Sequence, residues 1–527
     1  GLLESSPSLH QQKNPRVPNP IQFFAYSNQI MKSGGTPENN RRIAEAAYFP
    51  PTSLGLCKSS KIDFAYTEAC SLAWTMSLWS LAIHPAYLCS LVLRALPRLL
   101  RLTPSSLKKL CKHPPLIKTM EGASPELPQD ILMGIFATLE IPDLLRAGSV
   151  CSSWRSAYSR LRSLGHYTRP QTPCLLYTSE SAGESVACLY SLAEKRTYKL
   201  ALPGPPIRNR HLIGSSQGLL VTVDDRSEMH LVNPITGEQI NLPSVITVEH
   251  VKPIYNDSGA LHQYEYSYHS AKMVYGPPSI LALGELRNKL HHKAFVFSDT
   301  CNGYIVALIH NPASQLSVAR AGDDSWIWLP PYTNYDDCIY KNGLLYAVTS
   351  FGQIHAFDLS SPVLTMKMIT QELEPEDRFL NTYIVQAPWG NLLQVWRLCE
   401  HCDLEPEPGA SVFWSTGKLK IYEVDASSGE KIKKISCLRD HVLFLGHNQS
   451  LCLTAQDYPA LKGNHAYFTD DSVLWTRGLK NNPRDMGILD LGNNSREELF
   501  SPQLWSNCPA PVWITPNLRK MNLAFNE

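Results

Sequence analysis

The feature that most limits the fold of this chain is a change in the spacing of its apolar residues near residues 165–175. Before that point, from Ser124 to about Leu164, apolar residues recur at the three- and four-residue spacing of a helix face. After Pro170 the chain consists of short β-rich runs separated by Gly, Asn, Asp and Pro, and the pattern continues to the C-terminus. The sequence therefore predicts an α+β multidomain protein with a small helical module followed by one large all-β domain.

The β-rich region repeats one arrangement of strands and turns. A strand-like run meets Gly, a second strand follows, and an Asp or Asn turn leads to a third, most clearly in residues 218–243, 302–330 and 342–359. The step is 40 residues from Gly303 to Gly343 and 47 residues from Gly343 to Gly390. A period of about 40–50 residues with three or four strands per unit is typical of a β-propeller blade. We expect residues 174–520 to form a β-propeller of about seven blades, with a pair of β-sandwiches as the alternative.

The helical module, residues 120–165, is rich in large apolar side chains. Pro128 suits the start of a helix, and Pro142 ends it. The apolar positions between and after these prolines predict three short helices joined by tight turns. A module of this size cannot bury so many apolar side chains by itself. Part of its surface must therefore face a partner or the β-rich domain.

The module resembles the F-box at nearly every position of the pattern Leu-Pro-x-Asp-Ile-Leu, Ile-Phe, Asp-Leu-Leu-Arg, Val-Cys and Trp-Arg within residues 127–155. F-box proteins bind a Skp-type adaptor, which joins them to a cullin scaffold and its RING subunit. The resemblance implies the same partners here. Carried over position by position, the expected adaptor contacts are Leu127, Pro128, Ile131, Leu132, Ile135, Phe136, Leu144, Leu145, Val150, Cys151 and Trp154.

The β-rich domain is similar to the divergent propeller of a large plant F-box protein family, a domain of unknown function. The phrases S-x-x-G-L-L, N-P-x-T-G and the W-x-x-L-P of residues 326–330 carry this similarity. It implies a non-catalytic substrate receptor of an SCF-type E3 ubiquitin ligase, which holds a substrate lysine near a ubiquitin-charged enzyme. Two alternatives stay open: an F-box scaffold outside the ligase, tethered to a membrane or free, and a propeller enzyme.

Substrate recognition is expected on the loops of the β-domain, because loops vary without disturbing blade cores. Among them, residues 331–337 combine two aromatic anchors with two acids, Tyr332, Tyr335, Asp336 and Asp337, which would suit a protein substrate with a basic stretch. The alternative is an ordinary solvated connection between strands.

Residues 1–119 differ from the rest of the chain and are expected to be a largely disordered extension. They include one apolar segment, residues 71–93, which lacks Asp, Glu, Lys and Arg and is long enough to span a bilayer. His84-Pro85 interrupts this segment, and Met120 has the position of a natural start. We therefore expect an irregular tail with one apolar helix, and membrane anchoring as the lesser alternative.

Composition restricts the partners and the compartment. The formal net charge is +1, so nothing global favours nucleic acid or an anionic membrane as a partner. The 14 cysteines are scattered along the chain rather than paired at regular spacing, which favours reduced thiols in the cytoplasm or nucleus. No motif predicts a metal or a cofactor.

Overall fold

A computed structural model describes residues 127–518, apart from positions 166, 271–272, 275, 299–302, 321, 362, 372–378, 402–413, 426–431, 472–483, 500–502, 504 and 507. The predictions for residues 1–119, including segment 71–93, lie outside the described residues. Within the described part, no helix has the length and apolar character needed to cross a membrane.

Three helices form the N-terminal module, as the apolar spacing predicted: α6 (Gln129–Phe136), α7 (Ile141–Gly148) and α8 (Ser152–Ser163). Pro128 precedes the first turn of α6, and Pro142 lies in the first turn of α7. Proline is favoured there because the first N–H groups of a helix have no partner within the helix. The apolar faces of the three helices meet in one core.

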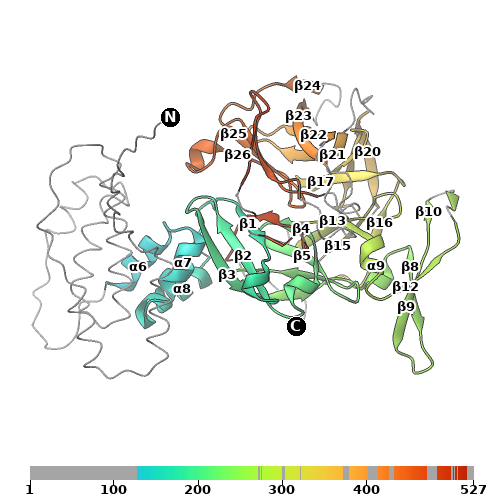
Figure 1. The fold of residues 1–527 in the computed structure, drawn as a ribbon, viewed down its shortest axis with the longest axis horizontal. Coiled ribbons are helices and arrows are strands. Elements are labelled where there is room, and N and C mark those ends of the chain that lie inside the picture. The colour runs from blue at the N-terminus through green and yellow to red at the C-terminus, as the bar shows by residue number, and fades with distance from the viewer. Residues whose placement is uncertain are drawn as a thin grey trace, which may run out of the picture. The chain divides into compact units, whose positions relative to one another are not determined.

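Six antiparallel or mixed sheets follow, and we call them blades 1–6 (Figure 1). Blade 1 contains β1 (Cys174–Tyr177), β2 (Val186–Ser191), β3 (Arg196–Ala201) and β30 (Val512–Ile514), and blade 2 contains β4 (His211–Ser216), β5 (Leu219–Val223), β6 (Met229–Val232) and β7 (Gln239–Asn241). Blade 3 contains β13 (His291–Ser298), β14 (Tyr304–His310), β15 (Gln315–Arg320) and β16 (Ile327–Leu329).

The remaining blades continue the series. Blade 4 contains β17 (Tyr335–Lys341), β18 (Leu344–Thr349), β19 (Ile354–Asp358) and β20 (Thr365–Thr370), and blade 5 contains β21 (Phe379–Gln386), β22 (Leu392–His401), β23 (Trp414–Val424) and β24 (Ile432–Ile435). Blade 6 has the order β26 (Leu451–Thr454), β25 (His441–Leu445), β27 (His465–Phe468), β28 (Gly487–Asp490) and β29 (Arg496–Glu497).

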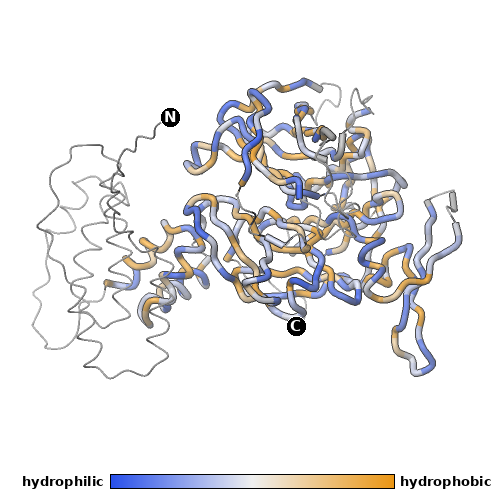
Figure 2. The backbone as a smooth tube through the Cα atoms, in the orientation of Figure 1, coloured by the Kyte–Doolittle hydropathy of each residue, from blue (hydrophilic) through white to orange (hydrophobic). Residues whose placement is uncertain are grey.

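The blades close into a ring. A separate buried apolar cluster lies between each pair of neighbours: blades 1 and 2, 2 and 3, 3 and 4, 4 and 5, 5 and 6, and finally 6 and 1. Blade 1 joins the two ends of the domain, because β30 pairs with β1 in the register Cys174 to Ile514. A closed ring leaves no blade without a covered face, which is the architecture of a β-propeller. Figure 2 shows apolar residues along the strands of the ring and on the three helices.

Tight turns connect the strands within the blades. Asn342 and Gly343 join β17 to β18 with φ angles of 52° and 84°, and Gln217 and Gly218 join β4 to β5 with φ angles of 52° and 81°. Two consecutive residues with positive φ make the turn that matches the twist of a hairpin, and the second position favours glycine.

The described residues form six blades, where the sequence indicated about seven. The stretch of chain that would be long enough for a seventh blade forms an inserted sheet between blades 2 and 3. It contains β8 (Val251–Tyr255), β9 (Leu261–Tyr266) and β12 (Ser279–Ala282), followed by the short helix α9 (Leu286–Lys289), and carries the small hairpin β10 (His269–Ser270) and β11 (Met273–Val274). Figure 1 shows this sheet projecting from the ring. Tyr264 and Tyr266 join the core between blades 2 and 3, so one face of the inserted sheet is covered.

Candidate functional site

The F-box core uses some of the residues expected to contact an adaptor. Leu132, Phe136 and Leu144 are at most 1% exposed and pack with Ala157 and Leu161 of α8. Phe136 also meets the ring of Trp154 edge-on, with 5.4 Å between centroids. These three side chains hold the helices together and are not available to a partner in this conformation.

The other expected adaptor residues remain at least partly uncovered. Pro128 and Ile131 are exposed, with Ile131 at 37%. Six more are half-buried: Leu127, Ile135, Leu145, Val150, Cys151 and Trp154. Apolar side chains left uncovered on adjacent short helices are typical of a protein-binding surface. The structure thus divides the predicted set into three core residues and eight candidate contacts.

A polar joint fixes the F-box to the first blade. The Ile141 N–H donates to Gln171 Oε1 at 2.7 Å, and Thr172 Oγ1 donates to Glu140 Oε1 at 2.9 Å. Burial raises the pKa of Glu140, and the hydrogen bond from Thr172 partly offsets that rise. Arg146 Nη1 donates to the Tyr198 hydroxyl of β3 at 3.3 Å. Sequence reasoning missed this joint, although a glutamine three positions before the apolar strand β1 was a signal that its side chain had a specific partner.

The two ends of the ring differ in what they carry. In an antiparallel blade with its first strand innermost, the turns after the first and third strands lie at one end. Contacts with the F-box come from this end: the β6–β7 turn of blade 2, the segment after β30, and the β2–β3 turn, which follows the third strand of blade 1 because β30 is the innermost strand there. We call it the F-box end. The inserted sheet and residues 330–334 belong to connections between blades, so they lie at the opposite end, which we call the far end.

The expectation that residues 331–337 form a loop, either for substrate binding or as an ordinary solvated connection, is wrong beyond Asn334, because β17 begins at Tyr335. Tyr335 and Asp337 are fully buried. The Tyr335 hydroxyl bonds His355 Nδ1 at 2.8 Å, and Asp337 accepts the Ile384 N–H and the Ser450 hydroxyl. A strand is expected where β-branched or aromatic residues follow one another. The pair Asp336-Asp337 interrupts such a run, so the sequence did not predict that β17 begins here. These acids serve as acceptors between blades and do not form an accessible surface.

Asp336 is half-buried and also points toward a neighbouring blade. Its carboxylate accepts the Ser350 hydroxyl at 2.7 Å and the Thr382 N–H at 3.0 Å. Burial raises the pKa of Asp336 to about 6 despite these hydrogen bonds. Only Tyr332 of the four predicted substrate residues therefore lies outside the strand and remains partly exposed.

Tyr332 belongs to an aromatic and acidic cluster at the far end that sequence reasoning did not assemble. Its ring lies 4.2 Å from that of Trp328, and its hydroxyl donates to Glu249 Oε1 at 2.9 Å. Burial and the neighbouring Glu249 carboxylate raise the pKa of Tyr332 to about 12. His269 Nε2 lies 3.8 Å from the same Glu249 oxygen, and its ring lies 4.3 Å from that of His250. The cluster joins the inserted sheet to blade 3.

Buried charges fill part of the ring centre. Lys293 Nζ lies 3.4 Å from Asp337 Oδ1 and 3.8 Å from Asp471 Oδ2, which connects blades 3, 4 and 6. Arg397 of β22 lies 3.2 Å from Asp471 Oδ1 and 2.7 Å from Asp485 Oδ2. Charges removed from water persist only when they are paired and hydrogen-bonded. Each of these groups has an oppositely charged partner within 4 Å, so the network suits a role in fixing the blades relative to one another.

Residues 214–218 match the pattern G-x-S-x-G of a nucleophile elbow, a match that sequence reasoning overlooked. An elbow requires a strand, a sharp turn and a helix. Here the pattern forms the hairpin between β4 and β5. Ser216 is 3% exposed, and its hydroxyl contacts the Val296 carbonyl and Gln449 Oε1. The pattern therefore does not build a catalytic serine.

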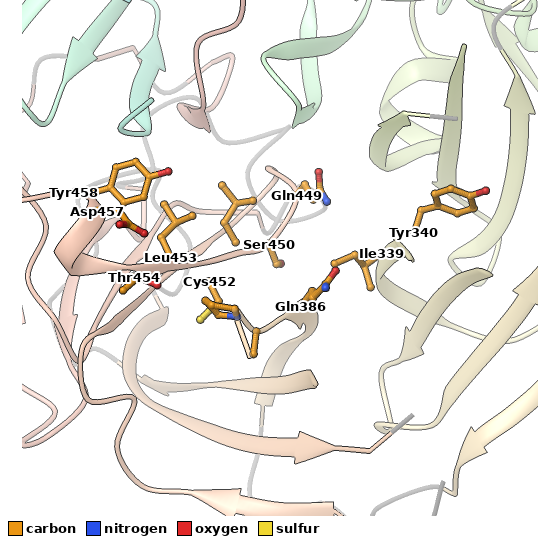
Figure 3. Close-up of a pocket in the computed structure, with 13 residues that line it drawn as sticks. Ile339, Tyr340, Gln386, Gln449, Ser450, Cys452, Leu453, Thr454, Asp457 and Tyr458 are labelled. Carbon is orange, nitrogen blue, oxygen red and sulfur yellow. The ribbon is translucent and has the colours of Figure 1, made fainter. Parts of the chain in front are cut away.

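A pocket of about 410 Å³ opens between the inner strands of blades 4, 5 and 6 (Figure 3). Apolar side chains of Ile339, Leu451 and Leu453 and neutral polar side chains of Gln386, Gln449 and Thr454 line it. Asp457 is the acidic side chain of the lining. Because the β17–β18 and β21–β22 turns lie beside it, the pocket is at the F-box end of the ring.

A three-helix F-box joined to a closed β-propeller defines the class of this molecule. Comparison with protein-family models agrees: residues 124–164 match the F-box-like family, and residues 189–490 match the KIB1-4 beta-propeller. The second match covers more than half of the chain, so the protein belongs to the family of F-box proteins with a KIB1-4 beta-propeller.

Curated relatives of this chain include F-box proteins of Arabidopsis thaliana. One is 23% identical over 399 residues, which cover 73% of this chain and 95% of the relative. F-box protein SKIP23 is 24% identical over 425 residues, covering 75% of this chain and 96% of its own length. F-box protein KIB4 is 22% identical over 366 residues, covering 68% and 85% respectively. The similarity thus extends across both the F-box and the propeller.

Proposed function

We propose that this protein is the substrate-receptor subunit of an SCF-type cullin–RING E3 ubiquitin ligase. In this proposal residues 120–165 bind a Skp-type adaptor, and the domain at residues 174–520 binds a protein substrate. The adaptor brings the cullin and RING subunits, and the receptor positions a substrate lysine without contributing a catalytic group. Such a ligase would act in the cytoplasm or nucleus.

The observation that carries the proposal is the uncovered apolar surface of the F-box. Ile131 is exposed on α6, while Leu132 and Phe136 of the same helix are buried in the core. A helix with one apolar face inside and further apolar residues outside gains free energy when a partner covers the outer residues. Membership of the F-box family supports a Skp-type adaptor as that partner.

The far end of the ring is the better candidate for substrate binding, since the F-box occupies the other end. Trp328 and Tyr332 provide aromatic anchors there, and Glu249 provides a negative charge beside them. Aromatic residues dominate the binding energy of many interfaces, and a carboxylate at the rim favours a basic partner. We therefore replace Tyr335, Asp336 and Asp337 by Trp328 and Glu249 in the proposed substrate-binding set and keep Tyr332.

The adaptor part of the proposal is tested with two matched substitutions in the full chain. Ile131→Asp places a charge on the uncovered F-box surface, and Ile280→Asp does the same on the inserted sheet, where Ile280 is 52% exposed. We expect Ile131→Asp to weaken binding of a purified Skp-type adaptor by about tenfold or more, as measured by titration calorimetry. Ile280→Asp should bind like the unmodified protein. Equal adaptor affinity in all three proteins would contradict the proposal.

A further inference from the structure

The segment that follows the last strand of the ring continues into the F-box. β30 ends at Ile514, after pairing with β1 in blade 1. Four residues later, Leu518 is 5% exposed and belongs to the F-box core together with Leu132, Phe136 and Leu161. Its carbonyl accepts a hydrogen bond of 3.3 Å from Arg162 Nε of α8. The core of the F-box is therefore completed by a residue more than 350 positions away in the chain.

Residues 515–518 follow a fixed path across blade 2. Asn517 Nδ2 donates to the Gln217 carbonyl at 2.9 Å, and Asn233 Nδ2 donates to the Asn517 carbonyl at 3.2 Å. The segment passes so close to the β4–β5 turn that a Cβ at Gly218 would lie 2.3 Å from Asn517 Cβ and 2.8 Å from the Thr515 carbonyl oxygen. A glycine at this turn is thus required by the segment as well as by its own φ of 81°.

We infer that residues 515–518 couple adaptor binding to closure of the propeller ring. Leu518 can reach the F-box only when β30 occupies its place in blade 1, because the intervening segment has just three residues. When the ring is open, the F-box loses a core side chain and the bond from Arg162. An F-box that is ordered only part of the time binds its adaptor more weakly, in proportion to the ordered fraction. A receptor with an incompletely folded propeller would therefore bind the adaptor weakly and enter the ligase less often.

This inference rests on the proposed adaptor binding and adds a condition to it. Three side chains of the F-box core also belong to helices that carry candidate adaptor contacts: Leu132 and Phe136 on α6, and Leu161 on α8 beside Trp154. When that core loosens, the candidate adaptor-contacting side chains move out of position, although none of them is itself altered. Residues 515–518 thus affect adaptor affinity by positioning these side chains and not by contacting the adaptor.

The decisive test compares Gly218→Val with Gly343→Val in the full chain. Both glycines occupy the second position of a two-residue turn between the first two strands of a blade, with φ angles of 81° and 84°. A side chain at Gly343 would meet no atom within 4 Å, whereas one at Gly218 would strike residues 515 and 517. Backbone strain is therefore matched, and only Gly218→Val displaces the segment.

We expect Gly218→Val to weaken adaptor binding by about tenfold, the loss that follows if the F-box is ordered about one tenth of the time. Gly343→Val should leave adaptor affinity unchanged. Hydrogen exchange should show faster exchange of α8 amides in Gly218→Val than in Gly343→Val. Equal adaptor affinity and equal α8 exchange in the two variants would overturn the inference.

A second variant tests the side chain itself in case Gly218→Val fails to fold. Leu518→Ala should weaken adaptor binding, and Leu518→Met, which preserves the volume, should restore it. Leu438→Ala removes the same group from a site 2% exposed between blades 5 and 6. It should lower the melting temperature yet keep adaptor affinity. Failure of the unmodified protein to bind adaptor would refute the proposed function, while unchanged affinity of Leu518→Ala would refute only the coupling.

Discussion

At the scale of single residues, burial sets the charge state of several histidines in the propeller. His310 of β14 is fully buried, and its ring nitrogens bond the Asn311 carbonyl at 3.0 Å and the Ser317 hydroxyl at 2.8 Å. Burial lowers the pKa of His310 to about 4, and the nearby His250 contributes in the same direction. Both neighbours of the ring suit a neutral imidazole, because one nitrogen donates and the other accepts.

His310 should make the protein less stable in mild acid. The unfolded chain binds a proton at His310 below about pH 6.5, but the folded chain does so only near pH 4. Its stabilising contribution is therefore complete above pH 6.5 and is lost as the pH falls toward 4. Between pH 7 and pH 5 this amounts to about 2 kcal/mol of unfolding free energy.

Chemical denaturation at pH 7 and pH 5 checks this expectation by comparing the unmodified protein with His310→Gln. The variant should lose less stability over that interval. Asp336 has the opposite effect on stability in acid, because its pKa is raised in the folded state and protonation therefore favours folding. This contribution is the same in the unmodified protein and in His310→Gln, so it cancels in the comparison. Identical pH dependence would mean that His310 titrates normally.

Single residues were also where sequence reasoning was least complete. Tyr332 and Tyr335 are only three positions apart, yet one is partly exposed and the other fully buried. Burial depends on the blade that packs against β17, and that information is not local to the sequence. The position of Leu518 in the F-box core was hidden for the same reason.

The two tyrosines should respond differently to truncation. Tyr335→Ala removes a ring from the core between blades 3 and 4, which should cost about 3–5 kcal/mol of unfolding free energy. Tyr332→Ala removes one hydrogen bond and one ring contact, so it should cost only about 1 kcal/mol. Denaturation curves measure both values. In a ubiquitination assay with the natural substrate, Tyr332→Ala should reduce ubiquitination of the substrate although the receptor remains fully folded. Undiminished ubiquitination would show that the substrate binds to another surface.

At the scale of helices and strands, the sequence predicted the elements correctly where apolar residues and turns recur at regular spacing. The three F-box helices followed from apolar residues on one face, and the blades followed from a repeat of 40–47 residues. The inserted sheet interrupts that repeat with strands of the same composition, so counting by length gave one blade too many. The core and outer faces of the F-box helices were not separable from spacing, because both are apolar.

The start of α6 provides the element-scale prediction for adaptor binding. Leu127 is half-buried against the F-box core, and Pro128 is exposed beside it. Replacing both with Ala should weaken adaptor binding by about thirtyfold, equivalent to about 2 kcal/mol, and should leave the propeller folded. Pro278→Ala with Ile280→Ala is the matched pair on the inserted sheet, where both residues are exposed. Co-purification of adaptor at equal yield with both pairs would count against these contacts.

At the scale of the whole molecule, the F-box and the ring form one continuous structure. The described F-box helices and the six blades belong to one compact unit. The F-box core includes Leu518 and is flanked by Ile235 of the β6–β7 turn, so two parts of the propeller contribute to it. In the proposed ligase receptor, this fixed joint would keep the distance between adaptor and substrate constant, which would favour transfer to lysines within a limited region.

A shortened chain that begins at Met120 should therefore retain the properties of the full chain. It contains the F-box helices, the six blades and the segment that ends at Leu518, and the F-box core described above is built from residues within 127–518. We expect its melting temperature to stay within about 2 °C of the full chain, because no contact between the described residues of that core is removed. Its affinity for the adaptor should also be unchanged. Calorimetric melting and adaptor titration measure the two quantities side by side. Aggregation of the shortened chain under conditions in which the full chain remains in solution would show that residues 1–119 contribute to the fold.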